Sequence, residues 1–416
     1  MKLQWKKERF CSESTFWTKI QQLSDLPFWS VMDIGPRWTC ATFSTQDPLA
    51  ELPSLCPASK PFPFPVPIGW VGWVGYEAAS LFDQAFKVKT AQSKPIELFF
   101  TNGAYVFDQH EQELHTIGNK SFFEMINEFR SISSGETVQK IPQSPLLQKD
   151  KYTEFTDGIQ KLKEAIREGE LYQCNLSWKS PNFYISDGFT LWKQIRTANT
   201  AQFGAYIKSP NIELICNSPE RFLRISGPKK DKIIETGPIK GTAHISEGLD
   251  GRLRLWSSSK ERAELTMVVD MCRNDLGRIA NAGSVTPSAR KIRRCGDLYH
   301  AEQTVRAQLK TNQTDRIFAA TFPPASVTGA PKHAAVEWIH SLEPHNRNAY
   351  TGSIGYIDLW GNAHWNVAIR TIQVLEKKAH FHVGCGIVHD SDPEMEWEES
   401  ISKSVAIMRC LGKNWI

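Results

Sequence analysis

Apolar side chains recur along the chain at the spacings that helices and strands need. Phe16, Ile20 and Leu23 are spaced to share one face of a helix, and the residues that follow alternate as in a strand. The first third of the chain is predicted to contain a helix over 14–23, a strand over 28–34, a hairpin of 98–107 and 114–117 closed by 108–113, and a helix over 122–129. No internal repeat is visible.

Residues 61–76 are uncharged and long enough to suggest a membrane span. They contain four prolines and then three glycines, at positions 61, 63, 65, 67, 69, 72 and 75. A helix that crosses a bilayer does not tolerate this density of proline and glycine. We predict an extended arm, a buried glycine-rich strand over 69–76 and a short helix near 77–82, with no membrane association.

Serine, glycine and proline gather at 131–149, the one stretch that is typical of a linker. Beyond it, apolar residues at helical spacing predict a helix over 152–168, which Gly169 ends. The alternation in 171–177 predicts a strand with Gln173 and other polar residues on one face. That face either meets solvent or lines a cleft.

Glu220 follows a short predicted strand and a proline. An acid at the end of a strand can be aimed at a site rather than held within a ladder. Judged from its neighbours in the sequence alone, however, Glu220 is expected at the surface.

Two predicted helices each carry paired glutamates on one face. Glu261 and Glu264 lie one turn apart in a helix over 260–270. The carboxy-terminal helix repeats this arrangement with Glu396, Glu399 and Lys403. It is bounded by Asp392, Pro393 and Gly412. Either pair alone is typical of a solvated acidic face, but two such helices together could hold Mg²⁺, with one glutamate of each pair binding the ion directly and the other holding water.

The last third of the chain is predicted to contain a helix over 297–309 and strands over 366–371 and 383–388. His300 lies near the start of that helix. Gly384 and Gly386 would let backbone amides approach an anion, and Arg370 could bind a carboxylate with two hydrogen bonds.

Two other features of this region do not predict a site. Residues 326–332 lack the spacing of a phosphate-binding loop, so nucleotide binding is not expected. His380 and His382 would share a strand face without a third ligand, and we predict that both are surface residues.

The pentapeptide Pro-Ile-Lys-Gly-Thr at 238–242 places Lys240 between a rigid proline and a glycine. Proline fixes one backbone angle, and Gly241 removes the side chain where a ligand could touch the backbone. We predict a loop that could hold Lys240 inward. A basic surface turn is the alternative, and only the accompanying acids weigh against it.

Composition excludes several classes of function. The chain has 416 residues, of which 41% are hydrophobic and 23% charged, and its net charge is +4. The basic residues in 290–294 lack interleaved aromatic residues, so we expect a solvated face and no nucleic-acid partner. Nine cysteines without a Cys-x-x-Cys pair indicate reduced thiols, no zinc and a cytoplasmic protein.

Six ordered motifs identify the chain as similar to the chorismate-utilising enzymes, which include anthranilate, isochorismate, salicylate and aminodeoxychorismate synthases. The motifs are residues 171–176, 218–220, 238–242, 264–275, 327–332 and 384–400. The resemblance covers about 152–411, and residues 26–34 and 69–76 resemble the amino-terminal region of members that work with an amidotransferase. It implies an α/β (α+β) fold, with two antiparallel sheets packed as a sandwich, helices outside and an active site in a cleft. Residues 1–145 would be the amino-terminal component I region and 150–412 the catalytic region of one chorismate-binding unit.

The resemblance also implies roles for individual residues. The implied Mg²⁺ ligands are Glu264 and Glu399, with Glu261 and Glu396 behind them. The residues implied to hold chorismate are Gln173, Gly241, Thr242, Thr328, Tyr350, Arg370, Gly384, Gly386 and Lys403. Glu220 is similar to a general acid that protonates the leaving hydroxyl, a role that needs a pKa raised by burial. His300 matches a family histidine whose role stays open.

Two positions separate the subfamilies that the chain resembles. Isochorismate and salicylate synthases have a lysine base where this chain has Gln173, and anthranilate synthases usually have alanine where it has Lys240. In aminodeoxychorismate synthases that lysine attacks ring carbon 2 of chorismate. The pair therefore favours component I of an aminodeoxychorismate synthase, supplied with ammonia by a separate glutaminase subunit. Anthranilate synthase component I and a non-catalytic chorismate-binding protein are the alternatives.

Overall fold

The structure, a computed structural model of the chain, describes residues 3–24, 26–49, 51–53, 62–91, 94–129, 149–228 and 230–412. The linker predicted at 131–149 lies outside these residues except for Lys149, which begins a helix.

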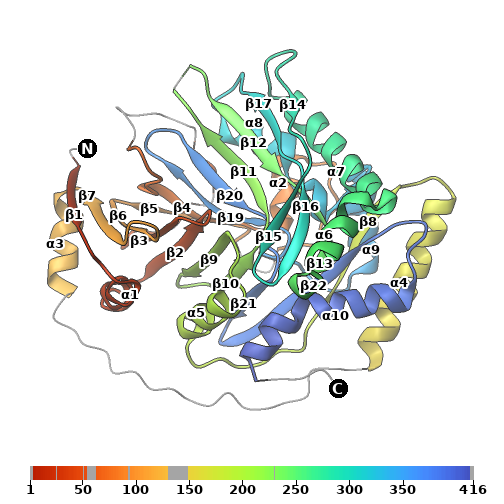
Figure 1. The fold of residues 1–416 in the computed structure, drawn as a ribbon, viewed down its shortest axis with the longest axis horizontal. Coiled ribbons are helices and arrows are strands. Elements are labelled where there is room, and N and C mark those ends of the chain that lie inside the picture. Colours follow the sequence, from red (N-terminus) through yellow and green to blue (C-terminus); the bar gives the residue numbers. More distant parts are fainter. Residues whose placement is uncertain are drawn as a thin grey trace.

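Two large antiparallel sheets and a small third sheet form the framework of the described chain (Figure 1). The first sheet has eleven strands, in the order β1 (Gln4–Glu8), β7 (Glu113–Gly118), β6 (Gly103–Asp108), β3 (Trp38–Ser44), β2 (Phe28–Ile34), β9 (Phe203–Lys208), β10 (Glu213–Ser218), β21 (Thr371–Leu375), β22 (Lys378–Ile387), β8 (Gln173–Lys179) and β18 (Gly329–Ala330). The second has eight, in the order β14 (Thr286–Pro287), β17 (Val305–Gln308), β12 (Ile233–Gly237), β11 (Arg221–Ser226), β20 (Ala363–Asn366), β19 (Ser353–Asp358), β4 (Gly69–Val74) and β5 (Ile96–Thr101). The third consists of β13 (Ile239–His244), β16 (Leu298–Glu302) and β15 (Lys291–Cys295). The predicted fold class, antiparallel sheets with outer helices, is confirmed.

Both large sheets combine strands from the two ends of the chain. In the first, β2 pairs with β9, with Val31 opposite Tyr206. In the second, β4 pairs with β19, with Trp73 opposite Ile354. The amino-terminal region therefore completes the same sheets that carry the predicted site residues.

The two large sheets meet through aromatic and aliphatic side chains. The ring of Phe28 from β2 stacks on that of Phe99 from β5, with centroids 3.9 Å apart. Trp73 and Leu214 are buried in the same cluster. Burying a large apolar side chain stabilises a fold by about 1.5–3 kcal/mol. This packing fixes the strand ends from which several site residues project.

The helices lie outside the sheets. Those predicted over 14–23, 77–82, 122–129, 152–168 and 260–270 are present, whereas four more, over 188–198, 248–257, 314–321 and 332–342, were not predicted. The helices of the described chain are α1 (Glu13–Gln21), α2 (Ala79–Phe82), α3 (Lys120–Phe129), α4 (Lys149–Arg167), α5 (Gly188–Ala198), α6 (Gly248–Ser257), α7 (Ser259–Gly277), α8 (Thr314–Thr321), α9 (Lys332–Leu342) and α10 (Pro393–Cys410), with short 3-10 turns η1 (Tyr76–Ala78), η2 (Ile245–Glu247) and η3 (Ala325–Val327). Figure 1 shows α4, α6, α7 and α10 grouped on the side of the molecule away from β1 and β7. In the part of the chain that is described, no helix is both long and apolar enough to span a membrane.

The predicted boundary signals of α10 are confirmed. The Asp392 side chain accepts hydrogen bonds from the backbone amides of Glu394 and Met395, and Pro393 occupies the first turn. Gly412 follows the helix with a φ of 63°, which glycine adopts without strain. These local contacts give α10 a fixed start, about one turn before Glu396 and two turns before Glu399.

The hairpin predicted from 98–107 and 114–117 is partly wrong. β6 and β7 do form a hairpin, but the chain turns between β5 and β6, and these two strands belong to different sheets. Every residue of β6 is buried, and only one residue of β5 is not. The turn lies at Asn102-Gly103, a turn signal in the sequence that the strand predicted over 98–107 passed through.

The helix predicted over 297–309 is wrong, because the segment forms strands β16 and β17. His300 and Ala301 point to opposite faces of β16, yet both are buried, at 5% and 0% exposure. A strand that is covered on both faces loses the alternation of polar and apolar residues that identifies a strand in a sequence.

The strand predicted over 366–371 is interrupted. β20 ends at Asn366 and β21 begins at Thr371. Between them, Arg370 has a φ of 52°, a left-handed conformation that interrupts an extended strand. The break places Arg370 in a connection between the two large sheets.

Candidate active site

Lys240 lies in an irregular strand with its side chain directed inward. The pentapeptide predicted as a loop lies mostly within β13, which pairs with β16. This pairing is irregular, because its register shifts between Lys240 and Ala243. The Lys240 side chain is 14% exposed, and its Nζ lies 3.6 Å from Oε2 of Glu264. A basic surface turn does not describe this geometry.

Gly241 allows β13 to approach the acidic helix α7. Its φ is +70°, and a Cβ at this position would lie 2.5 Å from Oε2 of Glu261. A larger residue would be strained in this left-handed conformation and would displace the glutamate. Glycine therefore keeps Glu261 against the backbone next to Lys240.

Gln173 and Gly386 complete the surroundings of the Lys240 amine. A Cβ at Gly386 would lie 3.0 Å from Nζ of Lys240 and 2.5 Å from Nε2 of Gln173. The two side chains thus converge above the same glycine of β22. Oε1 of Gln173 is buried and has no hydrogen-bond partner among the described residues, so it remains available to a ligand.

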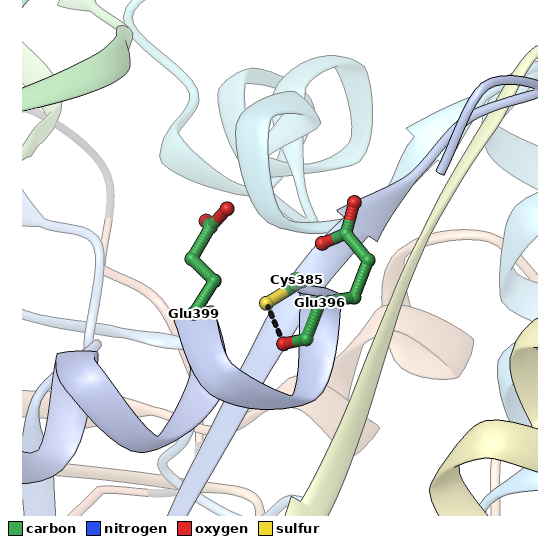
Figure 2. A group of neighbouring side chains, drawn as sticks. All are labelled: Cys385, Glu396 and Glu399. Carbon is green, nitrogen blue, oxygen red and sulfur yellow. Dashed lines mark hydrogen bonds between the residues drawn. The ribbon is translucent and has the colours of Figure 1, made fainter. Parts of the chain in front are cut away.

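On α10, Glu396 and Glu399 lie near Cys385 of β22 (Figure 2). One ligand atom from each of the three residues lies within 4.8 Å of the other two. The Cys385 thiol donates a hydrogen bond to the backbone carbonyl of Glu396 at 3.3 Å, the contact drawn in Figure 2. The thiol is therefore already hydrogen-bonded, and the two carboxylates supply the oxygen ligands, although Oε1 of Glu396 also accepts from Ser391.

The second predicted pair, on α7, is electrostatically coupled to the first. Burial raises the pKa of Glu261, and the charges of Glu264 and then Glu399 raise it further. Burial also raises the pKa of Glu396, with a contribution from Glu399. Such mutual repulsion is relieved by a divalent cation, and carboxylate oxygens are the donors that Mg²⁺ prefers. The residues present therefore fit the predicted metal.

A lysine faces each of the two predicted direct ligands. Nζ of Lys403 lies 2.8 Å from Oε1 of Glu399 and donates to the carbonyl of Gly384 at 3.0 Å. The Lys403 ammonium lowers the pKa of Glu399. Lys240 holds the corresponding place beside Glu264. Each ligand thus lies next to a cation that a substrate carboxylate could also contact.

Glu220 lies in a different environment, because it is only 3% exposed. Burial raises its pKa to about 7, although Ser326, Lys240 and Arg293 each act to lower it. Oγ of Ser326 donates to Oε1 of Glu220 at 2.5 Å. The backbone amide of Ile239 also acts on the carboxyl, which places it beside the strand that carries Lys240. A carboxyl group with this pKa can hold a proton near neutral pH and deliver it.

His300 is buried in β16 and bridges to β13. Its Nδ1 lies 2.9 Å from the carbonyl oxygen of Gly241 and 3.4 Å from Oγ1 of Thr242. Because a carbonyl can only accept, Nδ1 carries the hydrogen, and Nε2 is left as a buried acceptor without a partner in the described chain. Burial and then Arg370 lower the pKa of His300 to about 3, so the ring is neutral.

Arg370 and Tyr350 offer groups for an anionic ligand. NH1 of Arg370 is buried and has no hydrogen-bond partner among the described residues. Burial lowers the pKa of this guanidinium, as expected for a cation that has no counter-ion. Tyr350 is buried, and burial raises its pKa to about 12, so its hydroxyl stays a donor. An incoming carboxylate would satisfy NH1 of Arg370 and could also accept from the Tyr350 hydroxyl.

The two predicted threonines have unequal surroundings. Thr242 is exposed, and its hydroxyl reaches only His300. Thr328 is fully buried: its hydroxyl donates to the carbonyl of Pro324 at 2.8 Å, and its own carbonyl accepts from Asn175 at 2.7 Å. Thr328 therefore joins η3 to β8 and supports the strand that carries Gln173.

The prediction that His380 and His382 are surface residues is wrong, because they are 3% and 1% exposed. They lie on β22, which is flanked by β21 and β8 in the middle of the first sheet. The His382 ring lies 5.2 Å from that of Tyr350 and 4.8 Å from that of His345. Position within a sheet cannot be read from the local sequence, so no signal indicated their burial.

The basic segment predicted as a solvated face is only partly so. Arg293 turns inward, with its Nε 3.1 Å from Oε2 of Glu302. Its NH2 donates to the carbonyl of Pro219 at 3.1 Å, directly before Glu220 in the chain. Ser326 was likewise not identified as a site residue, and only its contact with Glu220 reveals it.

Comparisons with known proteins identify the family of the chain and its fold. The profile of a family described as chorismate binding enzyme matches residues 12–409. The chain is 36% identical to an anthranilate synthase component 1 of Haloarcula marismortui over 265 residues, 62% of this chain and 53% of that protein. It is 35% identical to the aminodeoxychorismate synthase component 1 of Escherichia coli over 266 residues, 62% of this chain and 58% of that protein. The match thus spans little more than half the length of these relatives. The crystal structure of anthranilate synthase component I from Streptococcus pneumoniae has a TM-score of 0.76 at 24% identity and covers 92% of each chain.

Proposed function

Because the chain belongs to the chorismate-binding enzyme family, we propose that it is component I of an aminodeoxychorismate synthase. It would replace the hydroxyl on ring carbon 4 of chorismate with the nitrogen of ammonia, giving 4-amino-4-deoxychorismate and water. The observation that carries this proposal is the position of Lys240. Its amine faces Glu264 and lies beside Gln173, at the centre of the predicted residues.

The reaction would proceed in two displacements. In the first, the neutral amine of Lys240 bonds to carbon 2, both ring double bonds shift by one position, and the bond from carbon 4 to its hydroxyl breaks. Glu220 gives its proton to the departing oxygen, which leaves as water. In the second, ammonia bonds to carbon 4, both ring double bonds shift back and the bond from carbon 2 to Lys240 breaks. The Glu220 carboxylate then takes a proton from the added nitrogen.

The other residues would bind and orient chorismate. We assign Mg²⁺ to Glu264 and Glu399, with Glu261 and Glu396 behind them, where the ion would neutralise the ring carboxylate. Arg370 and Tyr350 would hold the second carboxylate, with the buried NH1 of Arg370 supplying a free donor. The position of the neutral His300 against Gly241 supports a role in shaping this end of the site.

Gln173 supports amine chemistry rather than hydration. An amide cannot act as the base that would activate water for attack on chorismate. Ammonia would therefore be the second nucleophile, and we propose that a separate glutaminase subunit supplies it. The relatives named component 1 are consistent with a two-component enzyme.

Anthranilate synthase component I is the second candidate, because relatives with both names match at nearly equal identity. The two candidates give different products. Anthranilate formation releases pyruvate, whereas 4-amino-4-deoxychorismate keeps the enolpyruvyl group.

The proposal is tested by incubating the purified chain with chorismate, Mg²⁺ and an ammonium salt and identifying the products by mass spectrometry. We expect 4-amino-4-deoxychorismate without pyruvate. Anthranilate together with pyruvate would instead assign the second candidate. A parallel reaction with glutamine in place of ammonium should give no product unless a glutaminase subunit is added.

A further inference from the structure

Glu220 is held at its backbone as well as at its side chain. Its amide donates to Oγ of Ser218 at 3.2 Å, and its carbonyl accepts from the amide of Val367 at 3.0 Å. The carboxyl group therefore projects from a fixed point at the start of β11. Its direction depends on what the two carboxyl oxygens contact.

Ser326 contacts one of these oxygens and not the other. Its Oγ lies 2.5 Å from Oε1 of Glu220, and it makes no other hydrogen bond within the described residues. Ser326 is 9% exposed and lies in η3, more than 100 residues away along the chain. With no competing acceptor recorded for its hydroxyl, the hydrogen of Ser326 points at Oε1.

The cavity beside the carboxyl group has room for little water. Glu220 and Ser326 line a cavity of about 10 Å³, together with Thr236, Cys272 and Asp275. This volume holds one water molecule at most. Bulk solvent therefore does not replace the serine as a donor.

The charged and titratable groups around Glu220 come from several elements. They are Lys240 of β13, Arg293 of β15, Arg221 of β11, and Cys272 and Asp275 of α7. Asp275 is itself paired with Lys332 at 2.7 Å. Among these neighbours, Ser326 is the one whose side chain is recorded as a hydrogen-bond donor to the carboxyl group of Glu220.

We propose that Ser326 is a positioning residue that occupies Oε1 of Glu220 and thereby keeps the acidic proton on Oε2, directed at the leaving hydroxyl of the substrate. An oxygen that accepts a short hydrogen bond is the carbonyl oxygen of a protonated carboxyl group, so the proton resides on the other oxygen. The expected effect of Ser326 on catalysis rests on the proposed function, in which Glu220 is the general acid. The geometry of the pair in the resting enzyme does not depend on that function.

The proposal is tested with Ser326→Ala, and with Ser326→Thr as the variant that keeps a hydroxyl. Loss of a hydrogen bond to a charged or reacting group lowers rates by roughly 10- to 100-fold, so we expect kcat of Ser326→Ala to fall by this factor. KM for chorismate should change little. The donor favours the ionised carboxylate, so its removal raises the pKa of Glu220 further and moves the alkaline limb of the kcat profile to higher pH. Ser326→Thr should restore both rate and limb.

A second readout does not require turnover. The carbonyl stretching band of protonated Glu220 can be followed by infrared difference spectroscopy during a pH titration, with Glu220→Gln identifying the band. We expect Ser326→Ala to move the band and raise its titration midpoint, and Ser326→Thr to resemble the wild type. If the products of the wild type assign the other candidate function, the titration still tests the role of Ser326.

The proposal is overturned if Ser326→Ala leaves kcat, the alkaline limb and the infrared titration of Glu220 unchanged. It is equally overturned if kcat falls while the limb and the band stay in place, because the serine would then act only through packing.

Discussion

Five glutamates surround the candidate site in two environments that differ in water and in charge. Glu220 is buried behind Ser326, and burial raises its pKa to about 7. Glu399 is 56% exposed in its side chain and lies against Lys403, which lowers its pKa. The same side chain is therefore an acid at one end of the site and a permanent anion at the other. The difference comes from the neighbours of each glutamate and not from its own chemistry.

Removing one charged carboxylate should have the largest effect. Glu399→Gln keeps the size of the side chain but loses its charge. We expect activity to fall by more than about 100-fold, because loss of a residue that only supports a metal ligand already costs roughly 10- to 100-fold. Chorismate turnover at increasing Mg²⁺ measures this loss, and circular dichroism checks the fold. The matched control is Glu398→Gln, the exposed neighbour on another face of α10, which should be active. A fully active Glu399→Gln enzyme would remove Glu399 from the site.

Burial should lower the pKa of a buried histidine, whereas it raises the pKa of Glu220. Burial lowers the pKa of His380 to about 3, so this histidine is neutral in the folded protein. In the unfolded chain it has its ordinary pKa, and it becomes protonated when the pH falls below that value. The unfolded state then binds more protons, and the free energy of unfolding falls as pH falls. From about pH 7 to about pH 5, one such histidine costs about 2 kcal/mol.

His380→Gln should remove about that much of the pH dependence. Urea unfolding of both proteins near the two pH values measures the difference. A variant whose stability falls with pH as steeply as that of the wild type would show that His380 is not neutral when folded.

The buried acid should set the alkaline limb of the rate. Because Glu220 must be protonated to act and its pKa is about 7, kcat should fall as pH rises above about 7. The decline approaches tenfold per pH unit for a single essential acid. The pH profile of turnover checks this, and the residual rate of Glu220→Gln should lack the limb. A limb that persists in Glu220→Gln belongs to another group.

A methyl group at Gly241 should disturb the charged end of the site by the smallest amount. Gly241→Ala places a Cβ 2.5 Å from Oε2 of Glu261 in a left-handed backbone conformation. Gly248→Ala is the matched control, because its φ of +57° is similar but no atom lies within 4 Å. Both should lose about 1–2 kcal/mol of stability from backbone strain.

Only Gly241→Ala should also need more Mg²⁺ for half-maximal activity. Equal Mg²⁺ dependence in the two variants would show that Glu261 does not support the ion.

Much of the charged end could be predicted from the sequence, because its signals are local. The cap at Asp392, the proline that follows it and the spacing of Glu396 and Glu399 define a helix and its acidic face, and the structure has both. The buried part of the site around Glu220 depends instead on contacts between segments that are distant in the sequence. Glu220 is expected at the surface when judged from its neighbours in the sequence, and its burial was anticipated only from the family resemblance.

Two of the prediction errors share one cause, which is burial on both faces of an element. β16 was predicted as a helix because His300 and Ala301 are both buried. His380 was predicted at the surface because it has no third metal ligand beside it, but its strand lies in the interior of an eleven-stranded sheet. Neighbouring elements bury both faces of these strands, and the local sequence pattern does not indicate that burial.

The most direct test of the proposed function is a covalent adduct at Lys240. Wild-type protein incubated with chorismate and Mg²⁺ but without ammonia should accumulate the product of the first displacement, because no second nucleophile is present to release the lysine. Rapid quenching and peptide mass spectrometry should find Lys240 heavier by chorismate minus water, and Lys240→Ala should show no such adduct. If the wild type carries no adduct and Lys240→Ala forms 4-amino-4-deoxychorismate at the wild-type rate, Lys240 is not the nucleophile.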